Sequence, residues 1–199
     1  MRIKIFVLLC LTAIMQFTGV TPLKASHYYY KQLSLKDGVT SAVRCILTDK
    51  QGFVWIGTKA GISRYDGHEL KKYVYSPNNP HSIPNNLIHQ IAEDEMSNIW
   101  ILTDKGIARY QRQSDDFFLP TDEKGNPIIA YSTCLTKDGV LFGSKDKVYF
   151  YSYRDSSLRL LQKLNKGNNF NISLLSLWNE HTVLCCSRWQ GLALLDLKT

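Results

Sequence analysis

The chain has 199 residues and a formal net charge of +7, with 44% hydrophobic and 12% aromatic side chains. This length and apolar content are enough for one domain with a buried core. The composition excludes a disordered chain and a collagen-like repeat, because it is rich in aromatic residues and contains only 12 glycines and 6 prolines.

Residues 1–25 are predicted to be a secretory signal peptide. Arg2 and Lys4 lie at its start, and residues 5–14 form an apolar run that is too short for an ordinary membrane span. An uncleaved membrane anchor is the alternative, although polar residues interrupt the stretch that follows. Cleavage would remove three basic residues and leave an exported segment, 26–199, with a net charge of +4.

A block of about twenty residues recurs in the sequence at a constant offset of 45. The second copy repeats an Asp, a Trp, a Gly, an Arg and a Tyr of the first copy without a gap. The matched segments are Ile46–Asp49 with Ile91–Asp94, Val54–Thr58 with Ile99–Thr103, and Gly61–Tyr65 with Gly106–Tyr110. Two weaker copies, Leu135–Tyr151 and Leu174–Asp196, keep the apolar pattern but few of the residue identities.

Each copy predicts short β-strands separated by turns. In the first copy the strands a, b, c and d are expected at residues 43–48, 53–58, 62–65 and 70–75, with Asp and Gly residues in the turns. Strands a and b are almost continuously apolar, which predicts that both of their faces pack against neighbouring sheets. Four antiparallel strands repeated about every 45 residues are typical of the blades of a β-propeller.

The predicted fold is therefore all-β, with four four-stranded antiparallel blades at residues 39–82, 83–127, 128–170 and 171–199. The fourth copy supplies only strands a to c, and residues 28–33 are expected to be an orphan outer strand d ahead of the first blade. Such a strand can complete the last blade and so close a four-bladed ring without a free sheet edge. The alternative is an open arc that forms the N-terminal part of a larger ring.

The motif D-x-x-G-x-V-W-I-G-T-x-x-G-I-x-R-Y, from Asp49 to Tyr65, resembles two-component regulator propeller repeats, and residues 94–110 echo it. The resemblance covers essentially the whole segment 26–199, closely in the first two copies and loosely afterwards. It implies the N-terminal part of a seven-bladed propeller in the periplasmic sensor region of a hybrid two-component system. The remaining blades, an inner-membrane span, a histidine kinase and a DNA-binding domain would lie beyond this chain. It also implies detection of carbohydrate fragments, although the repeat motif itself is scaffold and identifies no ligand.

The sequence predicts no catalytic, cofactor or metal site. It contains no nucleophile elbow, phosphate-binding glycine loop or HExxH motif, and its five histidines are scattered over predicted turns. The carboxylate pairs Glu93–Asp94 and Asp115–Asp116 are interpreted as solvated turn residues. Trp55 and Trp100 are interpreted as packing between blades rather than as sugar-binding platforms. The four cysteines after the signal peptide are interpreted as structural thiols.

The charges in the predicted loops differ between the two faces of the propeller. The b–c and d–a loops share one face, and the b–c loops carry a net charge of +3. The a–b and c–d loops share the other face, and each set carries −3. The basic face is a candidate site for an anionic or sugar-like ligand, because converging cations raise the local concentration of anions. Ordinary solvated turns are the alternative. The candidate ligand-binding residues are Lys59, Lys105, Lys145, Lys147, Arg188 and Trp189.

The expected function is non-enzymatic ligand sensing in the periplasm. The expected partners are an oligosaccharide or anionic glycan, the remaining blades and downstream sensor domains, and a second copy held through those missing parts. Export and the low net charge argue against nucleic acid. The alternatives are an exported propeller enzyme acting on glycans and a structural or adhesion propeller. An enzyme is disfavoured because the strand a positions considered are mostly apolar: Ala42, Val43, Cys45, Ile88, Ile91 and Cys134.

Overall fold

The computed structural model describes residues 32, 42–164 and 170–197. The chain divides into two compact units, residues 1–32 and 33–199, of which the second contains every strand described below. The predicted signal peptide lies outside the described residues. Of the predicted outer strand 28–33, only Gln32 is described, and it belongs to no strand.

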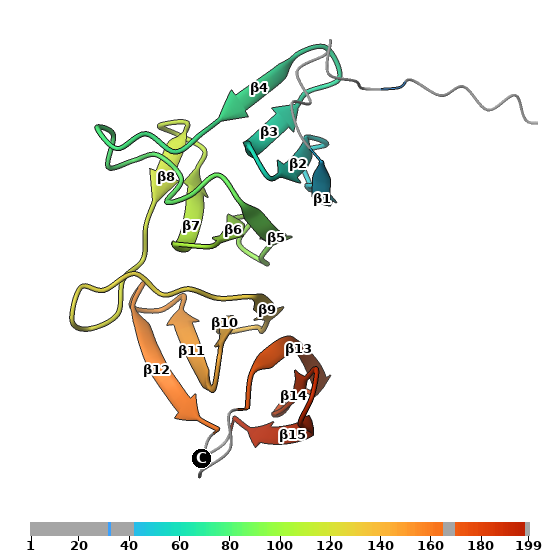
Figure 1. Ribbon diagram of the computed structural model, residues 1–199, viewed down its shortest axis with the longest axis vertical. Coiled ribbons are helices and arrows are strands. Elements are labelled where there is room, and N and C mark those ends of the chain that lie inside the picture. The colour runs from blue at the N-terminus through green and yellow to red at the C-terminus, as the bar shows by residue number, and fades with distance from the viewer. Residues whose placement is uncertain (1–31, 33–41, 165–169, 198–199) are drawn as a thin grey trace, which may run out of the picture. The chain divides into compact units, whose positions relative to one another are not determined.

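The first two sheets each contain four antiparallel strands, which pair in chain order (Figure 1). The strands of the first sheet are β1 (Val43–Thr48), β2 (Val54–Thr58), β3 (Gly61–Tyr65) and β4 (Leu70–Tyr73). Those of the second are β5 (Ile88–Glu93), β6 (Ile99–Thr103), β7 (Gly106–Gln111) and β8 (Asp116–Phe118). The two sheets have the same register, since Trp55 pairs with Arg64 and Trp100 pairs with Arg109.

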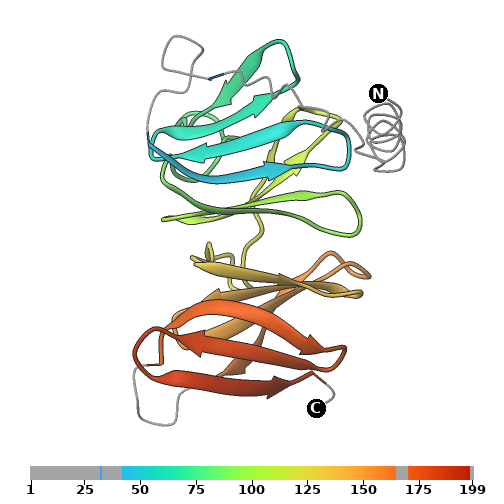
Figure 2. The same ribbon diagram turned by 90° about the vertical axis from the view of Figure 1, so that its right-hand side faces the viewer.

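The third and fourth sheets continue the same antiparallel pattern, and Figure 2 shows the sheets following one another in chain order. The third sheet contains β9 (Ser132–Leu135), β10 (Gly139–Ser144), β11 (Lys147–Ser152) and β12 (Leu158–Lys163). The fourth contains β13 (Ile172–Asn179), β14 (Thr182–Ser187) and β15 (Gly191–Asp196). The predicted all-β fold of propeller blades is confirmed. The fourth sheet has three strands among the described residues, as predicted for a fourth copy that supplies only strands a to c.

The turn between β1 and β2 forms because Asp49 bonds to its own backbone further along the chain. Its Oδ1 accepts the amide hydrogens of Gln51 and Phe53 at 3.0 and 2.9 Å. Gly52 follows with a φ of 89°, a conformation that glycine adopts without steric cost. The turn chemistry predicted for residues 49–52 is therefore confirmed.

The same aspartate also holds the tryptophan of the next strand. The Trp55 indole Nε1 donates to Asp49 Oδ2 at 2.9 Å. In the second sheet, Trp100 Nε1 donates in the same way to Asp94 Oδ2 at 2.7 Å, and in both pairs the two residues are six positions apart in the sequence. Both indoles are fully buried, and Asp94 is 0% exposed. A buried carboxylate is tolerated here because every bond it accepts replaces one from water.

The core lies between successive sheets. Trp55 packs edge-on against Tyr110 of the second sheet, and Trp100 packs against Phe142 and Tyr151 of the third, with ring centroids 4.8 to 5.2 Å apart. A third cluster joins the third sheet to the fourth through residues such as Leu141. The two tryptophans therefore pack between blades, as predicted.

Polar contacts repeat across these interfaces with the same spacing. Arg64 of β3 donates to the Tyr110 hydroxyl of the second sheet, and Arg109 of β7 donates to the Tyr151 hydroxyl of the third at 2.8 Å. The Arg and Tyr that end the repeat motif thus link one sheet to the next.

The prediction that both faces of strands a and b are covered is confirmed in the second sheet but not in the first and fourth sheets. All five residues of β6 are buried. In β1, by contrast, Val43 is 45% exposed and Ile46 63% exposed, and on β13 Leu174 is 52% exposed. The prediction of two covered faces is therefore wrong for the first and fourth sheets, because each of them has a described neighbour on one side only.

The buried aspartates predict a specific cost of mutation. Asp94→Ala removes the acceptor for Trp100 Nε1 and for the Asn98 amide, and it leaves the indole N–H buried without a partner. We expect the free energy of unfolding to fall by about 3 kcal/mol, since bonds to charged groups contribute about 1.5–3 kcal/mol each. Denaturant titration followed by tryptophan fluorescence measures this. Asp138→Ala, at an exposed carboxylate in the β9–β10 turn, is the matched control, with an expected change below about 0.5 kcal/mol. Equal losses in the two variants would contradict the role given to Asp94.

Candidate functional site

The turns between strands b and c lie beside the connections that lead to the next sheet. The Gly61 amide donates to the Asn86 carbonyl at 2.8 Å, and the Ile172 amide donates to the Lys145 carbonyl at 2.7 Å. We call this surface the b–c face, defined by the β2–β3, β6–β7, β10–β11 and β14–β15 turns. The surface formed by the turns between strands a and b and between c and d is called the a–b face.

The predicted ligand-binding residues lie on four successive turns of the b–c face. Lys59, Lys105 and Lys145 are exposed in the first three turns, whereas Lys147 is half-buried as the first residue of β11. Arg188 and Trp189 are exposed in the β14–β15 turn, where Trp189 is 81% exposed. The structure thus distributes these residues along the face rather than gathering them at one point.

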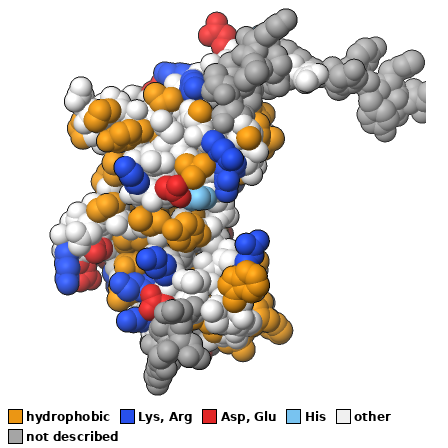
Figure 3. All heavy atoms as spheres, in the orientation of Figure 1, with side chains coloured by type: hydrophobic (Ala, Val, Ile, Leu, Met, Phe, Trp, Pro, Cys, Tyr) orange, Lys and Arg blue, Asp and Glu red, His pale blue; other side chains and the backbone are white. Residues whose placement is uncertain are grey.

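Acidic side chains interrupt the basic ones. Asp146 lies 3.7 Å from the Lys163 Nζ atom, and Asp104, next to Lys105, contacts His89. Figure 3 shows Lys and Arg side chains interspersed with acidic and hydrophobic ones on the surface turned toward the viewer. A ligand for this face therefore meets cations interrupted by acidic side chains rather than one continuous basic patch.

Four further residues, which the sequence did not single out, occupy one equivalent position on the inner strands. Near the start of strand a, its pairing with strand b skips one residue in three sheets, and the residues skipped there are Arg44, His89 and Ser173. In the third sheet Tyr131 takes this position, because its amide donates to the Gly143 carbonyl just before β9 begins. Such bulged residues are unpaired and their side chains are re-aimed. We call Arg44, His89, Tyr131 and Ser173 the bulge row.

The bulge row lies against the predicted basic turns. His89 Nε2 is 2.5 Å from Asp104 Oδ1, and Asp104 shares the β6–β7 turn with Lys105. The His89 ring also lies 5.4 Å from the Tyr131 ring, in an edge-to-face arrangement. Arg44, Tyr131 and Ser173 are exposed, and His89 is half-buried. Three members of the row therefore present a cation, a ring and a hydroxyl to the solvent, and the His89 ring joins the row to the turn that holds Lys105.

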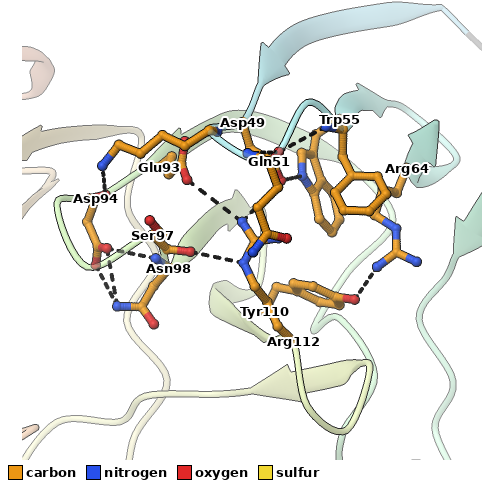
Figure 4. Close-up of polar contacts among 12 residues, drawn as sticks. Asp49, Gln51, Trp55, Arg64, Glu93, Asp94, Ser97, Asn98, Tyr110 and Arg112 are labelled. Atoms are coloured by element: carbon orange, nitrogen blue, oxygen red, sulfur yellow. Dashed lines mark hydrogen bonds and ion pairs between the residues drawn. The ribbon is translucent and has the colours of Figure 1, made fainter. Parts of the chain in front are cut away.

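On the a–b face, several charged groups form hydrogen bonds and ion pairs across the contact between the first two sheets (Figure 4). Arg112 donates to Asp49 Oδ2 at 3.0 Å and to the Ser97 carbonyl at 3.2 Å. The Lys50 amide donates to Glu93 Oε2 at 2.8 Å. Burial raises the pKa of Asp49, but the hydrogen bonds from Trp55 and Arg112 outweigh burial, so its pKa lies below its usual value.

The interpretation of the carboxylate pairs as solvated turn residues is wrong for Glu93 and Asp94, whereas the side chains of Asp115 and Asp116 are half-buried, at 31% and 28% exposed. Asp94 is fully buried on the Trp100 indole, and the Glu93 side chain is 7% exposed beside Arg112. Asp115 accepts the hydroxyls of Tyr110 and Tyr73 at 2.5 and 2.6 Å and pairs with Lys71. The partners Lys71 and Tyr73 of Asp115 come from the neighbouring sheet, whereas Asp94 is held within its own sheet by Asn98 and Trp100.

A cavity of about 990 Å³ opens on the a–b face of the third and fourth sheets. Its polar wall includes the Lys137–Glu180 ion pair at 2.6 Å, and its apolar wall includes Phe150, Leu161 and Leu197. None of the predicted ligand-binding residues and none of the bulge row lines it.

Within residues 42–164 and 170–197, no group of three or more His, Cys, Asp and Glu side chains is arranged to hold a metal ion. The four cysteines described there are free thiols; Cys134 and Cys185 are buried, whereas Cys45 and Cys186 are half-buried. The described part of the chain also contains no helix with the length and apolar character needed to cross a membrane.

Successive antiparallel sheets with the same strand order and register define this chain as a run of β-propeller blades. The model of the two component regulator propeller family matches residues 37–60, which include the first Asp and Trp of the motif. The resemblance seen in the sequence is therefore confirmed.

The chain is similar to parts of two-component signalling proteins. Over 59 residues it is 37% identical to "Histidine kinase P4" of Formosa agariphila, which covers 29% of this chain and 4% of that protein. The extracellular domain of the hybrid two component system BT3049 of B. thetaiotaomicron superposes with a TM-score of 0.72 at 18% identity. That match covers 84% of this chain and 25% of the solved one. The corresponding domain of BT4673 gives 0.61 at 22% identity, over 81% and 20%.

The Asp115 cluster predicts a pH dependence. Burial raises the pKa of Asp115, but the bonds from Lys71, Tyr110 and Tyr73 outweigh burial and lower the pKa from 3.8 to about 2. A carboxylate whose pKa is depressed in the folded state stabilises the fold above its unfolded pKa, and this contribution is lost as the pH falls from about 4 to about 2. We expect Asp115→Asn to be about 1–2 kcal/mol less stable at neutral pH and to lose less stability over that window. Urea titrations at several pH values measure both effects. Parallel acid profiles in wild type and variant would contradict this role, and Asp138→Asn serves as the exposed control.

Proposed function

We propose that this chain is the ligand-binding propeller segment of an exported, non-enzymatic sensor, and that its b–c face binds an anionic oligosaccharide. The observation that carries the proposal is the bulge row: one inner-strand position exposes Arg44, Tyr131 and Ser173 beside the basic turns. A repeated scaffold that varies its side chain at one exposed position is suited to recognition rather than to packing.

The chemistry of the face fits an acidic sugar. The planar guanidinium of an arginine such as Arg44 binds a carboxylate or a sulfate through two parallel hydrogen bonds. The Tyr131 ring offers an apolar surface with a polar tip, which matches the mixed faces of a pyranose ring. Exposed lysines at positions 59, 105 and 145 extend the positive charge along successive turns.

The comparisons support a sensing role. The relatives are a histidine kinase and the extracellular domains of hybrid two-component systems. This chain spans only a quarter or less of their length, so we propose that the transmembrane and kinase parts lie in sequence beyond it. Ligand binding would signal only if it favours one arrangement of the receptor over another, because a ligand shifts an equilibrium by its difference in affinity.

A non-enzymatic role is supported by the hydrogen bonds and ion pairs that the aspartates already form within the fold. Asp49 and Asp94 are committed to indole and backbone donors, and Asp115 is held by Lys71 and two tyrosines. A glycosidase needs two carboxyl groups that face each other across a substrate. On the b–c face Asp104 contacts His89 and Asp146 lies near Lys163, so each lies beside a basic partner.

Charge reversal on the b–c face tests the proposal. We expect Lys59→Glu, Lys105→Glu and Arg188→Glu together to weaken binding of uronic-acid oligosaccharides by about tenfold or more, because each reversal turns an attraction into a repulsion. A glycan array identifies the ligand, and titration calorimetry measures the loss. Arg154→Glu, at an exposed arginine on the a–b face, is the control and should bind as wild type does. Unchanged binding by the triple variant would refute the b–c face as the site, and preference for neutral sugars would refute the anionic ligand.

A further inference from the structure

The second sheet differs in charge from the rest of the b–c face. Its turn between strands b and c carries Asp104 beside Lys105, so this turn has no net charge. In the bulge row the first sheet adds Arg44, whereas the second adds His89. The turns of the other three sheets, counted with the first residue of strand c, are net positive: Lys59 in the first, Lys145, Asp146 and Lys147 in the third, and Arg188 in the fourth. Cations therefore lie on both sides of the second sheet, and an exposed carboxylate lies on it.

The fold holds Asp104 in place. The Thr103 hydroxyl donates to the Gly106 carbonyl across the turn, and His89 Nε2 lies 2.5 Å from Asp104 Oδ1. An ionised carboxylate only accepts hydrogen bonds, so the imidazole is the donor. The His89 side chain is 16% exposed, whereas that of Asp104 is 44% exposed. Within residues 42–164 and 170–197 no donor is bonded to Asp104 Oδ2. Asp104 therefore presents a fixed, negatively charged acceptor to a ligand.

Tyr131 of the third sheet forms an aromatic wall beside this acceptor. Its ring lies edge to face with that of His89, and it is 42% exposed. Gln90, next to His89, accepts the Thr133 amide at 3.2 Å, which ties the two sheets together at this place. Described sheets lie on both sides of this pair of sheets, so these residues are exposed within the interior of the array. We call His89, Asp104 and Tyr131 the central subsite.

We propose that the central subsite binds an uncharged sugar unit, and that the acidic groups of the same ligand lie on the cations to either side. This proposal rests on the proposed function of the b–c face. An acidic unit at the central subsite is opposed by Asp104, because like charges placed together are strongly disfavoured. A basic unit is opposed by Lys105 and Arg44 for the same reason.

An uncharged sugar matches the groups that the central subsite presents. A sugar hydroxyl can donate to the free oxygen of Asp104, and such a bond to an ionised acceptor is stronger than one between neutral groups. The apolar face of the sugar ring can cover Tyr131, whose ring is apolar and whose tip is polar. Because His89 and the turn already hold Asp104, binding requires little ordering of the site. The ligand class is therefore an oligosaccharide in which uncharged sugars separate the acidic ones.

A comparison of hexasaccharides tests the proposal. One set alternates uronic acids with neutral sugars, as hyaluronan and the galacturonate–rhamnose repeat do. The other set consists of uronic acid alone, as oligogalacturonate and oligomannuronate do. In calorimetric titrations of the full chain, we expect an alternating hexasaccharide to bind about tenfold or more tightly than every all-acidic one. A face that responded to charge alone would prefer the all-acidic set, which carries more negative charge.

Asp104→Asn tests the residue that sets this preference. The amide oxygen still accepts from His89, but the charge is gone, so the preference should shrink by about fivefold or more, mainly through tighter binding of the all-acidic set. Asp146→Asn is the matched control. It removes the same charge from the neighbouring turn, where Asp146 lies 3.7 Å from Lys163 Nζ, and it should leave the preference unchanged. Both residues lie in turns of the b–c face, and circular dichroism checks that each variant is folded.

The outcomes separate this proposal from the proposed function. If wild type binds the all-acidic set as tightly as the alternating set, the central subsite proposal is overturned and the proposed function stands. If Asp104→Asn leaves the preference unchanged, or Asp146→Asn changes it equally, Asp104 does not set it and the proposal is overturned as well. If neither set binds, the b–c face is not a site for acidic oligosaccharides, and both proposals are overturned together.

Discussion

The hydrogen bond from a buried indole to a buried aspartate, repeated in the first two sheets, is the contact on which the rest of the blade depends. It fixes three things at once. Asp49 shapes the turn by accepting backbone amides, it holds the Trp55 ring, and it receives Arg112 from the next sheet. A turn, a strand and an interface therefore share one carboxylate, and the ring it holds forms the core between the sheets.

The later sheets show what replaces this contact. In the third sheet Thr136 occupies the turn, where its hydroxyl bonds to Gly139, and Leu141 occupies the tryptophan position. The two side chains form no hydrogen bond with each other, as the Asp and Trp do, because leucine carries no donor. The interface between the third and fourth sheets is instead apolar, with Leu141, Val148 and Val183 in one cluster. Apolar packing thus maintains the blade geometry where the polar contact is absent. This explains why the later sequence copies keep few residue identities although their strands are present.

The strands were predictable from the sequence because turn residues and apolar runs are local signals. The exposed faces of β1 and β13 were not, since burial depends on which neighbour is present rather than on the residues themselves. The buried state of Asp94 was missed although its partners Asn98 and Trp100 are near in sequence, because a carboxylate in a turn was taken to be solvated. The hub around Asp115 was missed because partners such as Lys71 are distant in sequence. The bulge row was missed because a bulge is a property of strand pairing. The strand a positions considered in the sequence include Val43, Cys45 and Ile88, each one residue away from Arg44 or His89.

Repetition separates the parts of a blade that must stay constant from those that are free to vary. The Thr58 hydroxyl donates to the Gly61 carbonyl and the Thr103 hydroxyl to the Gly106 carbonyl, so the hairpins that carry the first two b–c turns are fixed alike. The bulge beside that hairpin imposes no such requirement, and the chain places an arginine at one copy and a histidine at the next. A scaffold held by backbone and buried contacts can therefore present a different chemistry at each blade without loss of stability. Recognition by such a surface depends on the order of the blades, because each blade contributes one side chain to the row.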